Sequence, residues 1–174
     1  MRRELTFFAY RYFVVPLEEQ ITLHQLTVEN KNQLVVDLFT RIKEKKYSFS
    51  VKNRKYIIYY TKKITDKIHL YKFARETYRT LHQEGDKDLQ PLEELDYPFI
   101  FLIVDFDKQI VLIQKKTTVF RNVETAKKRI EILINKEVEK FDYCILLEEI
   151  TYEGVFWEYL EQASEIYELN LKLN

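Results

Sequence analysis

The amino-acid sequence predicts an α+β fold, with a mixed, mainly antiparallel sheet and helices packed on the sheet. Three observations support this class. Hydrophobic residues make up 46% of the 174 residues and charged residues 32%, which provides a core and a surface and is unlike a disordered chain. Segments that alternate apolar and polar residues are interspersed with segments of helical period. One cysteine, two glycines and three prolines exclude a disulfide scaffold, a cysteine zinc site and low-complexity repeats.

The first half of the chain predicts a strand, a helix and a three-stranded meander. Leu5–Val15 is rich in aromatic and β-branched residues, and Pro16 ends it as a strand. Apolar residues at helical spacing predict a helix over Asn30–Lys45, with Asn30 or Asn32 as its N-cap. Three short strands follow, at Tyr47–Val51, Lys55–Lys63 and Lys67–Arg75. Polar residues between these strands suit tight turns, so we expect an antiparallel meander.

Residues 81–96 are the one candidate boundary in the chain. They include Gly85, Pro91 and six acidic residues, so we expect a solvated loop or linker there. Two interpretations of this segment are possible. It is either a seam between a basic N-terminal half and an acidic C-terminal half, or an exposed functional loop within one domain. We favour a single α+β domain over residues 1–174.

The second half predicts a hairpin followed by alternating helices and strands. Phe99–Asp105 and Ile110–Lys116 are apolar runs joined by a polar turn, which is typical of a buried hairpin. Asn122 is the expected N-cap of a helix that reaches Phe141. Tyr143–Ile150 contains a continuous apolar run and predicts a central strand buried on both faces.

The last part of the chain predicts one further helix and one further strand. Glu153–Ser164 has apolar residues on one helical face, and Ile166–Leu173 alternates like a strand. The expected order is therefore β-α-β-β-β, the acidic loop, and then β-β-α-β-α-β. Because the last strand continues almost to Asn174, the chain is either the front part of a longer protein or ends in a strand held inside the sheet.

The formal net charge is zero, but the two signs are separated along the chain. Residues 1–80 have 17 Lys or Arg and 8 Asp or Glu, a net of +9, whereas residues 81–174 have 11 and 20, a net of −9. The most basic stretch is Arg41–Lys63, and the most acidic is Glu137–Glu168. This separation predicts a face for an anionic partner or an attraction between copies of the chain.

The basic stretch interleaves cations with tyrosine and phenylalanine. Such a ribbon can bind single-stranded nucleic acid through phosphate contacts and base stacking. The alternative is that the aromatic rings pack inward while the lysines keep an exposed ribbon soluble. The candidate binding residues are Lys45, Lys46, Lys52, Arg54, Lys55, Tyr56, Lys62 and Lys63.

Catalytic and cofactor motifs give little support for an enzyme. Both glycines are isolated, so we expect no phosphate loop, and the three histidines have no close-spaced metal-ligating partners. Cys144 lies in an apolar run, where a thiol is usually an inert core residue. We therefore expect no cofactor and no metal.

One enzymatic alternative comes from the order hairpin, helix, strand over residues 99–150, which resembles the core of restriction-type nucleases. Asp105 and the segment Gln114-Lys115-Lys116 occupy roughly the places of the metal-binding acid and the acid-x-Lys motif, with glutamine in place of the acid. If Asp105 pairs near Ile110, Gln114 lies roughly 13 Å further along the strand, too far to share one metal. A degenerate metal nuclease is therefore the second alternative.

Our main functional expectation is a non-enzymatic module that binds a macromolecule. Tyrosine is enriched at protein interfaces, and the chain has 13 tyrosines, so we expect a protein partner or self-association. Nucleic-acid binding through residues 41–63 is the first alternative. The abundance of residues with AT-rich codons suggests a low-GC bacterium, phage or mobile element, a context that includes phage defence and counter-defence. The longest uncharged apolar run is too short for a membrane span, and the lone thiol fits a cytoplasmic location.

Overall fold

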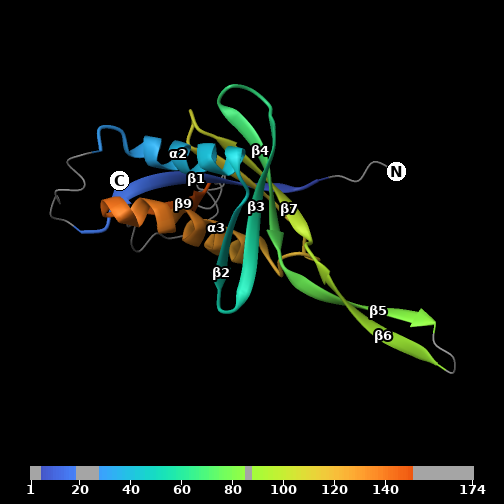
Figure 1. Cartoon of the computed structure of the whole chain (residues 1–174). Helices are drawn as coiled ribbons and strands as arrows, with labels where there is room; N and C mark the ends of the chain where they lie inside the picture. Colours follow the sequence, from blue (N-terminus) through green and yellow to red (C-terminus); the bar gives the residue numbers. More distant parts are fainter. Residues whose placement is uncertain (1–4, 19–27, 85–87, 151–174) are drawn as a thin grey trace, which may run out of the picture.

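The computed structural model describes residues 5–18, 28–84 and 88–150, shown in colour in Figure 1. Seven strands form one sheet in the order β2-β3-β4-β7-β8-β1-β9, and two more strands form a separate hairpin, β5-β6. The strands of the large sheet are β1 (Phe7–Pro16), β2 (Tyr47–Val51), β3 (Arg54–Lys63), β4 (Ile68–Arg75), β7 (Phe99–Asp105), β8 (Ile110–Gln114) and β9 (Tyr143–Glu149). The helices are α2 (Lys31–Glu44) and α3 (Val123–Val138), and a short 3₁₀ turn, η1 (Glu139–Phe141), follows α3. The predicted α+β class with a mainly antiparallel sheet is confirmed.

The sheet mixes strands from both ends of the described chain. All neighbouring strands are antiparallel, and β1 lies between β8 and β9. Phe7 is paired with Gln114 and Pro16 with Tyr143, so the first strand connects two strands from the second half. One continuous sheet therefore contains strands from both sides of residues 81–96.

Both helices begin at the asparagines that the sequence indicates. The Asn30 side chain accepts a hydrogen bond from the Asn32 backbone N–H, and the Asn122 side chain accepts one from the Thr125 N–H at 2.8 Å. These bonds satisfy N–H groups that a helix start leaves without partners. The helix predicted to reach Phe141 changes to the 3₁₀ turn after Val138.

The core lies between the helices and one face of the sheet. Leu38 and Phe39 of α2 and Ile130 and Leu133 of α3 are fully buried against it. Tyr12 is also fully buried, and its hydroxyl donates to the Asn32 Oδ1 at 2.5 Å, while the Asn32 amide donates to the Phe106 carbonyl at 2.9 Å. The start of α2 is thereby connected to β1 and to the β7-β8 turn.

The opposite face of the sheet is apolar but only half-buried. Alternate residues of the central strands, including Ala9, Phe101, Ile103 and Leu112, point away from the helices. No helix among the described residues covers them. The sheet thus has one well-packed face and one partly exposed apolar face.

The acidic segment 81–96 is not a loop, which corrects the sequence-based expectation. It forms most of a hairpin made of β5 (Thr77–Glu84) and β6 (Leu89–Asp96), which projects from the sheet like an arm (Figure 1). Pro91 stands opposite His82, and a proline is tolerated in a strand at the edge of a sheet. We call β5 and β6 together the arm.

The strand β9 is also different from the expectation. It was predicted to be buried on both faces, but it is the last strand of the described sheet, paired with β1. Tyr143, Ile145 and Leu147 face the core, whereas Leu146 is 43% exposed. In the apolar run 144–147, alternate residues thus pack on the core, and the others lie on the partly exposed face of the sheet. The predicted helix Glu153–Ser164 and strand Ile166–Leu173 lie outside the described residues.

Within the described part of the chain, neither helix has the length and apolar composition that a membrane crossing needs.

Candidate functional site

The predicted basic residues lie on the β2-β3 hairpin, but at its two ends. Lys52 and Arg54 are at the turn, next to Lys55. Lys45 and Lys46 precede β2, whose first residue Tyr47 is paired with Ile58, and Lys62 and Lys63 lie further along, at the far end of β3. The ends of β3 are roughly 30 Å apart at ~3.3 Å per residue. The hairpin therefore carries two separate groups of cations.

Two of these cations are paired with carboxylates. The Lys55 Nζ lies 3.6 Å from the Glu76 carboxylate, and the Lys63 Nζ lies 2.7 Å from that of Asp66. The hydrogen bond with Asp66 raises the pKa of Lys63 and lowers that of Asp66. The remaining candidate cations, Lys45, Lys46, Lys52, Arg54 and Lys62, are exposed and form no ion pair within the described ranges.

Tyr56, the aromatic member of the predicted set, lies in the core. It is 2% exposed, and its ring stacks on Phe49 at a centroid distance of 5.4 Å and on Phe73 at 6.0 Å. The same stack continues to Phe120. These rings contribute packing between the sheet and the segment before α3. Tyr56 is therefore buried and unable to stack on a bound base, whereas the candidate cations are exposed.

Asp105 and Gln114, the candidate nuclease residues, both complete backbone hydrogen bonding. The Asp105 Oδ1 accepts from the N–H groups of Asp107 and Lys108, each at 3.0 Å, which closes the β7-β8 turn. Gln114 is 6% exposed, and its Oε1 accepts from the Phe101 N–H at 2.9 Å. Asp105 is paired with Ile110, which places Gln114 four residues further along β8, as the sequence indicates. The described residues contain no group of three or more His, Cys, Asp or Glu placed to hold a metal ion.

His69 and Cys144 are the other groups with potential chemistry. The His69 ring packs against Phe106, and burial, followed by the nearby charges of Lys43 and Lys63, lowers its pKa. Burial, followed by the charge of Glu139, raises the pKa of the Cys144 thiol. Both shifts favour the uncharged form at neutral pH, which fits a packing role better than a catalytic one.

The arm exposes large apolar side chains on both of its faces. Cross-strand pairs on opposite faces are Tyr78 with Leu95 and Leu81 with Leu92. Tyr78 is 70% exposed, and the leucines Leu81, Leu89, Leu92 and Leu95 are also exposed. A two-stranded hairpin has no interior of its own to bury such residues. The sequence gives no sign of this surface, because Gly85, Pro91 and the acidic residues of 81–96 are typical of a loop.

A pocket of about 450 Å³ lies at the root of the arm. Its lining includes Tyr59, Lys72, Tyr97 and Phe99, and the Lys72 Nζ lies 4.6 Å from the centre of the Phe99 ring. The Tyr97 hydroxyl donates to the Glu76 carboxylate at 3.0 Å. The pocket therefore combines aromatic walls with one cation, a composition suited to an aromatic group next to a negative charge.

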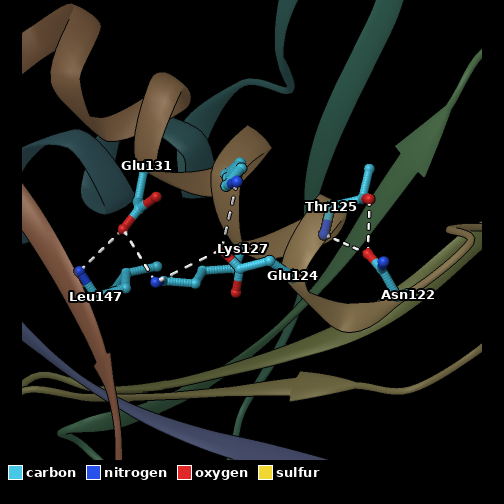
Figure 2. A network of polar contacts seen from close by, with 7 residues as sticks. Asn122, Glu124, Thr125, Lys127, Glu131 and Leu147 are labelled. Atoms are coloured by element: carbon cyan, nitrogen blue, oxygen red, sulfur yellow. Dashed lines mark hydrogen bonds and ion pairs between the residues drawn. The ribbon is translucent and has the colours of Figure 1, made fainter.

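At one edge of the large sheet, the strand β9 has outward backbone N–H groups that bond to side chains of α3. At β9, the outward backbone N–H of Ile145 donates to the Asn135 Oδ1 at 2.7 Å, and that of Leu147 donates to the Glu131 Oε1 at 3.1 Å. Figure 2 shows Glu131 between Leu147 and Lys127, whose Nζ lies 3.8 Å from the carboxylates of both Glu131 and Glu124. Side chains of α3 therefore bond to two outward N–H groups of this edge strand.

Comparison with known proteins gave no match to this chain, whether to a protein-family model, a curated protein sequence or a solved structure.

Proposed function

We propose that this chain is a docking module that binds another protein, or a second copy of itself, through the arm and the pocket at its root. The observation that carries the proposal is the set of exposed leucines on a projecting two-stranded hairpin. Apolar groups held away from the core contribute little to the folded chain alone, but contact with a partner would remove them from water.

The charge of the arm adds a preference for the partner. Within the arm the carboxylates Glu84, Glu93, Glu94 and Asp96 outnumber the cation Arg79, and Asp88 immediately before β6 adds another negative charge. Arg79 itself lies 3.9 Å from the Asp96 carboxylate. A partner surface with a basic rim around an apolar centre would complement this arm.

The experiment compares the wild-type chain with the double variant Leu81→Ser, Leu92→Ser, which removes one exposed cross-strand pair. Sedimentation velocity measures self-association, and quantitative mass spectrometry measures which proteins the immobilised chain retains from cells that express it. We expect either a dimer or one retained protein, at least tenfold reduced in the variant. Thr80→Ser is the matched control, because Thr80 is an exposed residue of the same strand, next to Leu81. An identical association state and retained set for wild type and variant would contradict the proposal.

Nucleic-acid binding is a second candidate, favoured by the exposed, unpaired cations described above on the β2-β3 hairpin. Fluorescence anisotropy with single-stranded DNA, duplex DNA and RNA at two salt concentrations tests it. Charge reversal at Lys45, Lys46, Arg54 and Lys55 should weaken binding strongly if phosphates contact this hairpin. Absence of binding at low salt would reject this candidate and leave the protein partner.

A further inference from the structure

The strand β2 forms the other edge of the large sheet, and its outward backbone groups can be assigned from the turn. Lys52 and Asn53 have positive φ angles of 47° and 61°, which is the type I′ geometry of a two-residue hairpin. Val51 and Arg54 therefore exchange both backbone hydrogen bonds, and so does every second pair along the strands. Ser48 and Ser50, which lie between these pairs, direct their N–H and C=O groups away from β3.

This edge has no cap among the described residues, in contrast to β9. No backbone or side-chain hydrogen bond to Ser48 or Ser50 from outside the β2-β3 pair occurs in this part of the chain. Both serines are exposed. Their small side chains also leave space for a neighbouring strand. Among the described residues, two outward N–H groups of β9 are thus bonded to Glu131 and Asn135, whereas the outward groups of Ser48 and Ser50 on β2 have no such partner.

Cations stand at both ends of the open edge. Lys45 and Lys46 precede β2, and Lys52 and Arg54 follow it; all four are exposed and without an ion-pair partner in the described ranges. Lys46 and Lys52 are separated by roughly 20 Å along an extended strand. An added strand of about seven residues with carboxylates near both ends would match this spacing.

We propose that β2 is a docking edge that takes an extended acidic segment of a protein partner as an additional strand of the sheet. Backbone hydrogen bonds to Ser48 and Ser50 would hold the segment, and the flanking lysines would select its charge. The inference shares with the proposed function only the idea that the partner is a protein. It uses a surface separate from the arm, so each can fail while the other holds.

The test uses the full chain and a synthetic peptide, Ac-Glu-Glu-Val-Thr-Val-Glu-Glu-NH₂, with a lysine-for-glutamate peptide as the control probe. Hydrogen exchange detected by NMR measures the protection of individual amides. We expect the acidic peptide to slow exchange at Ser48 and Ser50 at least tenfold, with no change at Phe49, whose amide already bonds to β3. Equal binding of the lysine peptide, or binding without protection of the two serines, would overturn the proposal. An edge that binds neither peptide would show that the lysines only prevent aggregation.

Two variants separate backbone from charge recognition. Ser50→Pro removes an outward donor and keeps the bonds of Phe49 and Val51 to β3, whereas Ser50→Thr keeps the donor and is the matched control. Lys46→Glu combined with Lys52→Glu reverses the charge at both ends. Lys108→Glu combined with Arg121→Glu, at two exposed positions outside β2, gives the same change in net charge and is the control. We expect at least tenfold weaker binding of the acidic peptide for Ser50→Pro and for the double variant, and unchanged binding for the controls. If Ser50→Pro does not fold, the double variant decides, and its unchanged affinity would reject the proposal.

Discussion

Buried or half-buried amide side chains connect parts of this molecule that are distant in sequence. Gln114 lies at the last position of β8, and its Oε1 accepts from the Phe101 N–H, so the side chain extends the β7-β8 ladder by one bond. Asn32 similarly bridges the Tyr12 hydroxyl and the Phe106 carbonyl. An unpaired buried N–H costs more free energy than a single hydrogen bond contributes.

Replacing Gln114 by leucine should therefore destabilise the fold. The substitution retains the volume but leaves the Phe101 N–H without an acceptor, and we expect a loss of about 1–3 kcal/mol in the free energy of unfolding. Urea unfolding followed by circular dichroism measures it. Gln83→Leu, on the exposed arm, is the control, with an expected change below roughly 0.5 kcal/mol. Equal stability of the Gln114 variant and the wild type would contradict this role.

Glu137 should make stability depend on pH in the acidic range. Burial acts to raise its pKa, but hydrogen bonds from Lys140 at 3.0 Å and Arg41 at 2.7 Å outweigh burial and lower it. Because the folded state binds the proton less readily than the unfolded state, the stabilisation is complete above the ordinary glutamate pKa. It is lost as the pH falls through the lowered value.

The variant Glu137→Gln tests this linkage. Stability at neutral pH should fall by about 1 kcal/mol, since both cations remain largely in solvent. The difference between variant and wild type should shrink as the pH falls below about 4, close to the reference glutamate pKa. Urea midpoints at several pH values provide the measurement. A difference that stays constant from neutral to acidic pH would show that Glu137 acts through packing alone.

At the scale of elements, α3 both covers the core and protects an edge. Its apolar side packs on the sheet, and Glu131 and Asn135, one turn apart, reach the N–H groups of Leu147 and Ile145. Four residues of helix rise about 6 Å and two residues of strand about 6.8 Å. The two spacings match closely enough for consecutive outward amides of β9 to find consecutive side chains of α3.

Removing one of these caps should expose β9 selectively. We expect Asn135→Ala to speed hydrogen exchange at Ile145 at least tenfold and to destabilise the fold by about 1 kcal/mol. Lys128→Ala, on an exposed part of α3, should change neither quantity. NMR-detected exchange distinguishes local opening from global unfolding, because a purely global effect would also speed exchange at core amides such as Leu102.

Sequence patterns predict those elements whose neighbours along the chain determine them. The caps Asn30 and Asn122 and the tight turn after Val51 are local signals, and each is present in the structure. The arm escaped prediction because Tyr78 with Leu95 and Leu81 with Leu92 lie on opposite faces, so neither strand shows an alternating pattern. Which edge is capped depends on where α3 lies, and no local pattern gives that position.

For the candidate site, the exposure of the charged residues could be predicted from the sequence, but the residues that lie beside them could not. The lysines are exposed, as their sequence pattern indicates, but Tyr56 packs into the core instead of standing beside them. The open edge at Ser48 and Ser50 has no signal in the sequence, since it depends on β2 lying outermost in the sheet.

For the molecule as a whole, the arm is an extension of an otherwise continuous sheet. β4 and β7 are paired directly, with Ala74 opposite Phe99, and the Arg75 N–H donates to the Pro98 carbonyl at 3.0 Å just before the arm begins. The core residues do not include any from the arm. The arm is therefore expected to contribute little to the free energy of unfolding of the sheet.

Replacing residues 77–96 by Asn-Gly, which joins β4 and β7 through a short turn, should leave the fold intact. We expect cooperative urea unfolding with a midpoint close to that of the wild type, and loss of the partner or self-association assigned to the arm. Unfolding of the shortened chain would show instead that the arm contributes to the stability of the sheet.

The position of β1 between β8 and β9 has a consequence for synthesis on the ribosome. The strand β1 is synthesised long before its two neighbours in the sheet, β8 at residues 110–114 and β9 at residues 143–149. At ~5–20 residues per second, that delay lasts on the order of ten seconds. During it, Tyr10 and Tyr12 lack the strands that flank them in the finished sheet. A nascent chain of this protein is thus expected to need a chaperone, or a late and rapid closure of the sheet.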